Sequence, residues 1–153
     1  MKARQRKVGL LDVNVLIALI DPAHEFHSSA HAWFTRNRHT GWATCPITEN
    51  GCIRIMGKPG YPFPGLTVDL VRGIMAELVQ LEGHRFWPDS FSMLETNRIN
   101  LAEAGSKHLT DIYLIGLAAA QGGRLVTFDQ SIRWRAVTGC SPDNLEVLQG
   151  SPA

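Results

Sequence analysis

Short apolar runs without a helical period alternate along this chain with longer segments in which apolar residues recur at helical spacing. The first run, residues 8–11, is followed by the polar residues Asp12 and Asn14, and residues 15–20 are apolar again. A short run of this kind is typical of a strand buried on both faces, and the stretch after it predicts a helix capped by Asn14. The alternation predicts a central parallel sheet in a three-layer α/β/α fold.

The same pattern assigns the rest of the chain. Strands are predicted over residues 41–44, 85–87, 124–129 and 145–148, and helices over residues 24–37, 47–56, 67–81, 90–98 and 109–121. Pro46 lies at the first turn of the 47–56 helix, while Thr110 is expected to cap the 109–121 helix and Gly122 to end it. The glycines and prolines of residues 57–65 predict a stiff surface loop without phosphate-loop spacing.

Composition narrows the class of protein. Of the 153 residues, 44% are hydrophobic and 19% are charged, which fits one compact domain spanning residues 1–153. The net charge of +1 produces no overall field toward nucleic acid or an anionic membrane, so contact with nucleic acid has to come from local patches. No apolar stretch approaches the ~20 residues of a membrane span.

The N-terminus and the cysteines favour a cytoplasmic protein. The first residues are basic and then apolar, but Asp12 and Asn14 interrupt the apolar part, so we do not expect a secretory signal. Cys45, Cys52 and Cys140 are odd in number and lack paired zinc spacing, which predicts reduced thiols.

Acidic residues fall where this fold would bring them together. Asp12 and Asp129 end two predicted strands, whereas Glu49 and Asp111 lie in the opening turns of two predicted helices. The carboxyl ends of parallel strands and the amino ends of crossover helices share one rim of the sheet, so we expect all four in a single cleft. Each acid alone is weak evidence, because turns and helix amino ends favour Asp on local grounds.

The set predicts a metal site. Carboxylates packed together repel one another unless a proton or a cation joins them, and oxygen ligands without histidine or thiolate suit Mg²⁺ or Mn²⁺. Such an ion activates water and stabilises an in-line phosphoryl displacement, which is the chemistry of a metal-dependent nuclease. We therefore predict Asp12, Glu49, Asp111 and Asp129 as the catalytic and metal-binding residues. The side-chain oxygens of Asn14 and Thr127 are expected to support them.

The segments around these acids carry a family resemblance. They are LLDVNVLIAL around Asp12, TENGCIRI around Glu49, HLTDIYLIGLA around Asp111 and RLVTFDQSI around Asp129. Together they resemble the PIN domain and, more narrowly, the VapC toxins of bacterial type II toxin–antitoxin systems. The likeness runs from residue 8 to about residue 148, although the 57–65 loop and the basic aromatic turn 133–135 fall outside the matching segments.

The resemblance implies a five-stranded parallel sheet of the PIN type. It further implies an endoribonuclease that depends on Mg²⁺ or Mn²⁺ and cleaves RNA phosphodiester bonds. It also implies a homodimer and a cognate VapB-like antitoxin that neutralises the toxin.

Two other functions remain as alternatives. A receiver-type phosphoryl-accepting domain also uses strand-end acids with magnesium, but neither Thr44 nor Trp87 supplies the acid that such a domain needs on a middle strand. A non-catalytic module of the same fold would bind only RNA or protein, and such a module would be expected to have lost at least one of the four acids.

Large apolar residues on the predicted helices favour a homodimer. They exceed what one small core is expected to cover, and a symmetric pair is the commonest way to bury such surface. These residues are Trp33, Phe34, Phe91 and Met93.

Overall fold

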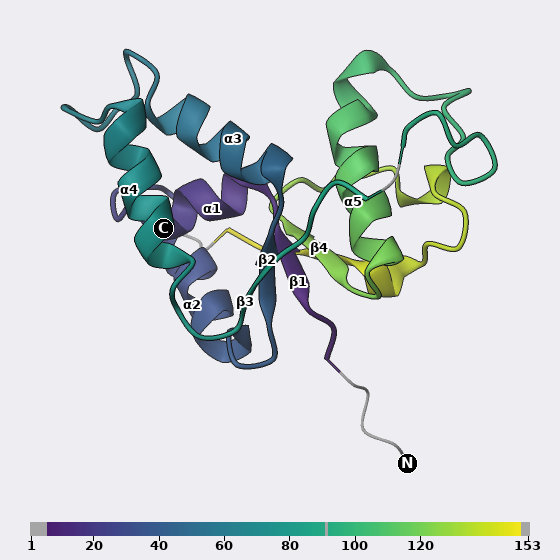
Figure 1. Ribbon diagram of the computed structural model, residues 1–153, viewed down its shortest axis with the longest axis horizontal. Coiled ribbons are helices and arrows are strands. Elements are labelled where there is room, and N and C mark those ends of the chain that lie inside the picture. The colour runs from purple at the N-terminus through teal and green to yellow at the C-terminus, as the bar shows by residue number, and fades with distance from the viewer. Residues whose placement is uncertain (1–5, 91, 151–153) are drawn as a thin grey trace.

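One parallel sheet runs through the middle of the molecule. The computed structural model describes residues 6–90 and 92–150 (Figure 1). The five strands lie in the order β3-β2-β1-β4-β5. They are β1 (Gly9–Leu11), β2 (Trp42–Thr44), β3 (His84–Phe86), β4 (Arg124–Thr127) and β5 (Leu145–Val147). This sheet confirms the predicted α/β class, and its order differs from the 2-1-3-4-5 order of receiver domains, which argues against the phosphoryl-accepting alternative.

Helices cover both faces of the sheet, as Figure 1 shows with the sheet nearly edge-on. On one face lie α1 (Val13–Ile20), α2 (His27–Asn37), α3 (Pro46–Met56) and α4 (Val68–Leu78). On the other lies α5 (Leu109–Ala120), preceded by the 3-10 turn η1 (Ser106–His108) and accompanied by the loops around residues 92–105 and 132–144. The three layers predicted from the sequence are therefore present.

The central strand explains why the sequence folds this way. Leu10 and Leu11 are both fully buried, and because successive strand residues point to opposite faces, Leu10 packs with α5 while Leu11 packs with α1 to α4. Gly9 allows a close approach at the start of the strand, since a Cβ there would lie 2.8 Å from the Trp33 ring and from Val126. The short apolar run thus holds two cores together.

Two helix caps differ from the predictions. The N-cap of α1 is Asp12, because the chain passes directly from β1 into the helix and the Asp12 carboxylate accepts a hydrogen bond from the Val13 N–H at 2.7 Å. Asn14 already lies inside that helix. The N-cap of α5 is His108, which makes no side-chain capping bond because η1 leads into the helix, so Thr110 is not a cap.

The predicted helix over residues 90–98 is also wrong. The described residues of that segment, 90 and 92–98, form turns and irregular backbone. The Ser92 hydroxyl accepts a hydrogen bond from the Leu94 N–H at 3.1 Å, and the Glu95 carboxylate accepts one from the Ser92 N–H at 3.3 Å. Such local bonds compete with helix formation in a segment this short.

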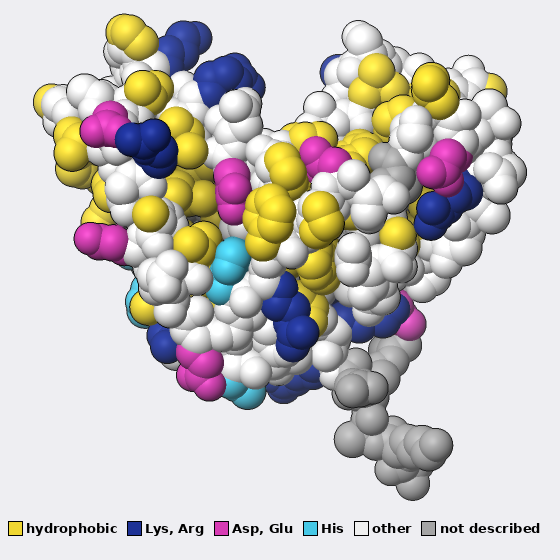
Figure 2. All heavy atoms as spheres, viewed as in Figure 1, with side chains coloured by type: hydrophobic (Ala, Val, Ile, Leu, Met, Phe, Trp, Pro, Cys, Tyr) yellow, Lys and Arg dark blue, Asp and Glu magenta, His cyan; other side chains and the backbone are white. Residues whose placement is uncertain are grey.

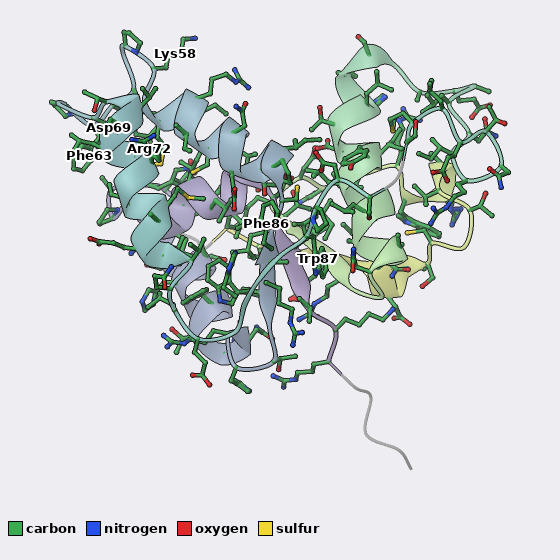
Figure 3. The ribbon with its side chains drawn as sticks, viewed as in Figure 1. Lys58, Phe63, Asp69, Arg72, Phe86 and Trp87 are labelled. Carbon is green, nitrogen blue, oxygen red and sulfur yellow. The ribbon has the colours of Figure 1, made fainter. Side chains whose placement is uncertain are left out.

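The remaining elements agree with the predictions to within a few residues. The helix predicted over 24–37 begins at His27, the one predicted to residue 81 ends at Leu78, and β3 ends at Phe86 rather than at residue 87. Phe86 is 52% exposed while the neighbouring Trp87 is 6% exposed (Figure 3).

Residues 57–65 form the expected surface loop, and the Tyr61 hydroxyl ties it to Asp21 at 2.6 Å. The three cysteines are unpaired. No helix in the described part of the chain has the length and apolar character of a membrane span.

Candidate active site

Asp12 lies at the carboxyl end of the central strand and is only 7% exposed. Its Oδ1 accepts the Val13 N–H at 2.7 Å, and its Oδ2 accepts the Thr127 hydroxyl at 2.7 Å. Burial, together with the charge of Asp129, raises the pKa of Asp12, although the two hydrogen bonds oppose this rise. The carboxylate is therefore fixed in position, partly desolvated, and close to a second acid.

Asp111 and Asp129 complete a group of three carboxyl groups. Asp111 lies in the first turn of α5, Asp129 lies two residues after β4, and their side chains share a hydrogen bond. Two bonds from Ser131, from its N–H at 2.8 Å and its hydroxyl at 2.7 Å, hold the pKa of Asp129 below its usual value. Burial, followed by the charges of Asp12 and Asp129, raises the pKa of Asp111 to about 7. The proton shared by this pair therefore resides on Asp111, which loses it as the pH rises through about 7.

Glu49 has different partners. Its Oε2 accepts the hydroxyl of Thr44, the last residue of β2, at 2.7 Å, and the same hydroxyl oxygen lies 2.8 Å from His84 Nε2. Because that hydroxyl proton is donated to Glu49, the His84 ring must carry its proton on Nε2. Burial lowers the pKa of His84, and the neutral ring that results suits this arrangement.

A cleft of about 540 Å³ opens over two of the acids. Asp12 and Asp111 lie in it with Thr110 on one wall, and Asn50 and Arg54 of α3 lie on the other. Figure 2 shows this face of the molecule hollowed between the two helical layers.

Gly51 brings the α3 wall close to α1, since a Cβ there would lie 2.7 Å from the Val13 side chain. Glu49 directly precedes Asn50 and Gly51 of the α3 wall but does not itself line the cleft.

The supporting residues predicted from the sequence lie beside Asp12. Thr127 is fully buried, and its hydroxyl donates to Asp12 and accepts the Asp129 N–H at 3.0 Å. Asn14 Nδ2 donates to the Thr127 hydroxyl oxygen at 3.4 Å, and Asn14 Oδ1 accepts the Phe128 N–H at 3.4 Å. Thr127 therefore connects the two strand-end acids.

Sequence reasoning missed three residues that shape the site. They are Thr44, His84 and Ser131. Two of them carried a usable signal, because Thr44 ends its strand as Thr127 does, and Ser131 follows Asp129 by two residues, the usual spacing of an Asp side chain that bonds the backbone ahead of it.

The chemistry of the three Asp carboxylates fits a hard divalent cation, because a buried group of like charges otherwise has to keep a proton. Within residues 6–90 and 92–150, however, no three His, Cys, Asp or Glu side chains already have the spacing of a metal site. Binding would therefore require the Asp111–Asp129 hydrogen bond to open. The donors fit the ion by type, and their side chains would have to turn toward it.

Comparison with known proteins decides the family. No family model matches the chain. Ribonuclease VapC44 of Mycobacterium tuberculosis is 43% identical over 141 residues, which covers 92% of this chain and 99% of the relative. Ribonuclease VapC39 of the same organism is 43% identical over 133 residues, covering 86% and 95% of the two chains. The chain belongs to the VapC ribonuclease family.

A third relative extends the comparison. Ribonuclease VapC38 of Mycobacterium tuberculosis is 37% identical over 125 residues, covering 82% of this chain and 87% of its own. Membership of the VapC family confirms the resemblance carried by the segments around the four acids, and the observed sheet is the one expected of a PIN fold. It also supports the hydrolase class predicted from those acids.

Proposed function

We propose that this VapC-family chain is the toxic component of a type II toxin–antitoxin module and acts as a divalent-metal-dependent endoribonuclease at the cleft between α3 and α5. The observation that carries the proposal is the group formed by Asp12, Asp111 and Asp129. Their mutual repulsion and burial raise the pKa of Asp111 to about 7, which is a state that a cation relieves.

In this proposal each acid has a defined part. A bound Mg²⁺ or Mn²⁺ would activate a water molecule and neutralise the charge that develops on the phosphate. Asp12, Asp111 and Asp129 are proposed to hold the ion, with Thr127 and Asn14 orienting Asp12 and Ser131 orienting Asp129. Glu49 is proposed to act from the β2 side of the same rim.

Arg54 supplies a positive charge to the cleft. It lines the wall opposite Asp111. A guanidinium there is proposed to hold the RNA backbone, because it can bond two phosphate oxygens at once and stays charged at any working pH.

The test is cleavage of single-stranded RNA by purified protein with Mg²⁺, with Mn²⁺ and with a chelator. We expect cleavage that requires the ion. If RNA is bound but not cut under any of these conditions, the non-catalytic alternative holds instead.

The proposed partner is a cognate antitoxin that neutralises the toxin. A metal-free cleft containing several carboxylates attracts a guanidinium, so we expect the antitoxin to place an Arg among Asp12, Asp111 and Asp129. Magnesium should then weaken the complex, and Asp111→Asn should bind the antitoxin less tightly. An affinity that is indifferent to both would contradict this mode of neutralisation.

A homodimer remains a proposal, but its basis changes. Trp33 and Phe34 are buried within the protomer, at 1% and 5% exposure, Met93 packs partly against the core, and Phe91 lies outside the described residues. One group of exposed apolar side chains lies instead on and beside α4. It consists of Phe63, Val68, Leu70, Ile74 and Leu81.

The α4 surface offers a direct test of the dimer. Leu70 is 54% exposed, and Figure 3 shows Phe63 beside Asp69 and Arg72 near the start of the helix. We expect light scattering to give about twice the 16.9 kDa of one chain, and Leu70→Glu to give a monomer. Leu94→Glu is the matched control, because Leu94 is 86% exposed and its neighbour Met93 packs against the core on the α5 side of the sheet. A wild-type protein of 16.9 kDa at micromolar concentration would contradict the dimer.

A further inference from the structure

A second pocket, of about 370 Å³, lies beside α5 and outside the cleft. Its walls come from residues 100–104 and from η2 (Trp134–Ala136) with the preceding Arg133. The polar and aromatic side chains that line it are Asn100, Glu103, Arg133, Trp134 and Arg135. Arginine beside an aromatic ring and a carboxylate is a combination that can recognise a nucleobase.

Backbone hydrogen bonds join the two walls. The Asn100 N–H donates to the Ala136 carbonyl at 2.8 Å, the Thr138 N–H donates to the Arg98 carbonyl at 2.8 Å, and Ile99 and Val137 form an antiparallel bridge between them. The pocket is therefore built in advance, and a ligand would not have to pay the entropy of bringing the two loops together.

Trp134 and Arg135 form a cation–π pair at the pocket. The Arg135 guanidinium lies 4.7 Å from the centre of the Trp134 ring, and Trp134 is half-buried and packs against the core beneath α5. The ring therefore supports the guanidinium on one side, while Arg135 itself is exposed. Unpaired bases of single-stranded RNA stack on guanidinium planes as they do on aromatic rings.

The remaining groups supply both hydrogen-bond donors and an acceptor. Asn100 Oδ1 already accepts the Ala102 N–H at 3.0 Å, so the side chain has its amide N–H groups to offer. Glu103 is exposed and forms no ion pair among the residues that the structure describes. Its carboxylate can accept two parallel hydrogen bonds.

Arg133 links this pocket to the acids. Its Nε donates to His108 Nε2 at 3.2 Å, and His108 is the N-cap of α5, three residues before Asp111. Arg133 lies four positions after Asp129 in the chain, a span of roughly 14 Å at most. An RNA strand that leaves the cleft past Asp129 can therefore extend to the pocket.

We propose that this pocket binds a guanine base of single-stranded RNA next to the nucleotide that is cleaved, an inference that rests on the ribonuclease function proposed above. Guanine has two adjacent donors, N1–H and the N2 amino group, that match the Glu103 carboxylate. Its O6 and N7 acceptors match arginine donors. Arg135 provides the surface on which the base stacks, and the pocket thereby sets which sequence is cut.

The experiment compares short uridine-rich RNAs that contain one guanine, one inosine or one adenine at the same position. Inosine lacks only the N2 amino group, so it removes one of the two bonds to Glu103. Binding is measured by fluorescence anisotropy in an Asp12→Asn background, and cleavage is measured with the wild-type protein in magnesium. We expect guanine to be preferred over adenine by roughly tenfold in both measurements, which is the range of one good bidentate contact, and over inosine by a smaller factor because one bond to Glu103 remains.

Variants assign this preference to the pocket. Glu103→Ala should abolish the preference for guanine over inosine, because it removes the acceptor for the N2 amino group, while Arg135→Ala should weaken binding of all three RNAs. Arg38→Ala is the matched control, because Arg38 also lies over an aromatic ring, 5.6 Å from the centre of Phe34, but at the end of α2. Arg38→Ala should change neither the preference for guanine over inosine nor the binding of the three RNAs.

The outcomes separate this inference from the proposed function. Equal binding and cleavage of the three RNAs by the wild-type protein, or a guanine preference that survives in Glu103→Ala, would overturn the base pocket while leaving the ribonuclease intact. A guanine preference in binding without magnesium-dependent cleavage of any RNA would support the pocket and reject the ribonuclease.

Discussion

Two threonines on either side of the central strand make nearly the same contact. Thr127 ends β4 and Thr44 ends β2, both are fully buried, and each donates its hydroxyl to a carboxylate at 2.7 Å. The acceptor is Asp12 on the β4 side and Glu49 on the β2 side. The two threonines thus occupy equivalent positions on one rim of the sheet.

They differ in what stands next to each carboxylate. On the β4 side Asp12 faces two further carboxyl groups, and the pKa of Asp111 rises to about 7 because of burial and the charges of Asp12 and Asp129. On the β2 side Glu49 shares the Thr44 hydroxyl with the imidazole of His84. Strand-end acids that share a rim therefore need not share one electrostatic site, and the neighbours determine whether a carboxylate attracts a cation.

The largest expected effect comes from removing a charge on the β4 side. Asp12→Asn keeps the shape and the helix-capping oxygen but removes one charge from the proposed metal site. RNA cleavage in magnesium should fall by more than the roughly 100-fold loss typical of a residue that only supports a metal ligand. Circular dichroism melting should show that the variant still folds. Cleavage at the wild-type rate would remove Asp12 from the site.

The two threonines provide a matched pair of variants. Thr127→Val and Thr44→Val each remove one buried hydroxyl, so both should lower the free energy of unfolding by about 1–3 kcal/mol. Cleavage should separate them, with a loss of roughly 10–100-fold for Thr127→Val, which frees Asp12, and a much smaller loss for Thr44→Val. Equal losses of activity at equal stability would show that the two regions act as one site.

Glu49→Gln tests the β2 side directly. Glutamine still accepts the Thr44 hydroxyl but carries no charge, so cleavage should fall by about tenfold or less, the lower end of the effect of a supporting residue. Steady-state cleavage rates of Glu49→Gln and Asp12→Asn, measured together, would check that the loss is smaller for Glu49→Gln. A loss as large as that of Asp12→Asn would show that Glu49 turns into the cleft and holds the ion with the other acids.

The smallest expected effect is the change in the stability of the metal-free protein with pH. The pKa of Asp111 in the folded protein, about 7, lies above its ordinary value of 3.8, so the stability that its protonated form contributes is present below pH 3.8 and is lost as the pH rises to about 7. The metal-free protein should therefore melt at a lower temperature at pH 8 than at pH 5.5. Magnesium should raise the melting temperature more at pH 8, where it does not compete with a proton.

Asp111→Asn is the control for this pH dependence. The variant cannot titrate at this position, so both the decline with pH and the response to magnesium should shrink. A decline of unchanged size would assign the titration to another group.

Much of the fold followed from local patterns. Short segments without a helical period predicted all five strands to within a few residues. The positions of the four acids at strand and helix ends predicted that they would meet in one cleft; Asp111 and Asp129 do interact beside Asp12, but Glu49 does not line the cleft. Such features are encoded over a few neighbouring residues, which is why they can be read from one sequence. The failed 90–98 helix and the two misassigned caps depended on which backbone groups each polar side chain bonds, and the pattern alone does not fix that choice.

The sequence by itself determined that this is a parallel α/β protein of the VapC type with acids along one rim of its sheet. Only the tertiary structure decided that Asp111 shares a proton with Asp129, that Glu49 bonds Thr44 beside His84, and that the turn at Arg133 closes a pocket against residues 100–104. The physical reason is that strand register and helix placement select the rim on which a residue lies. The direction of its side chain and the pKa of its carboxyl group are set by groups that are distant in sequence and are brought together only by packing.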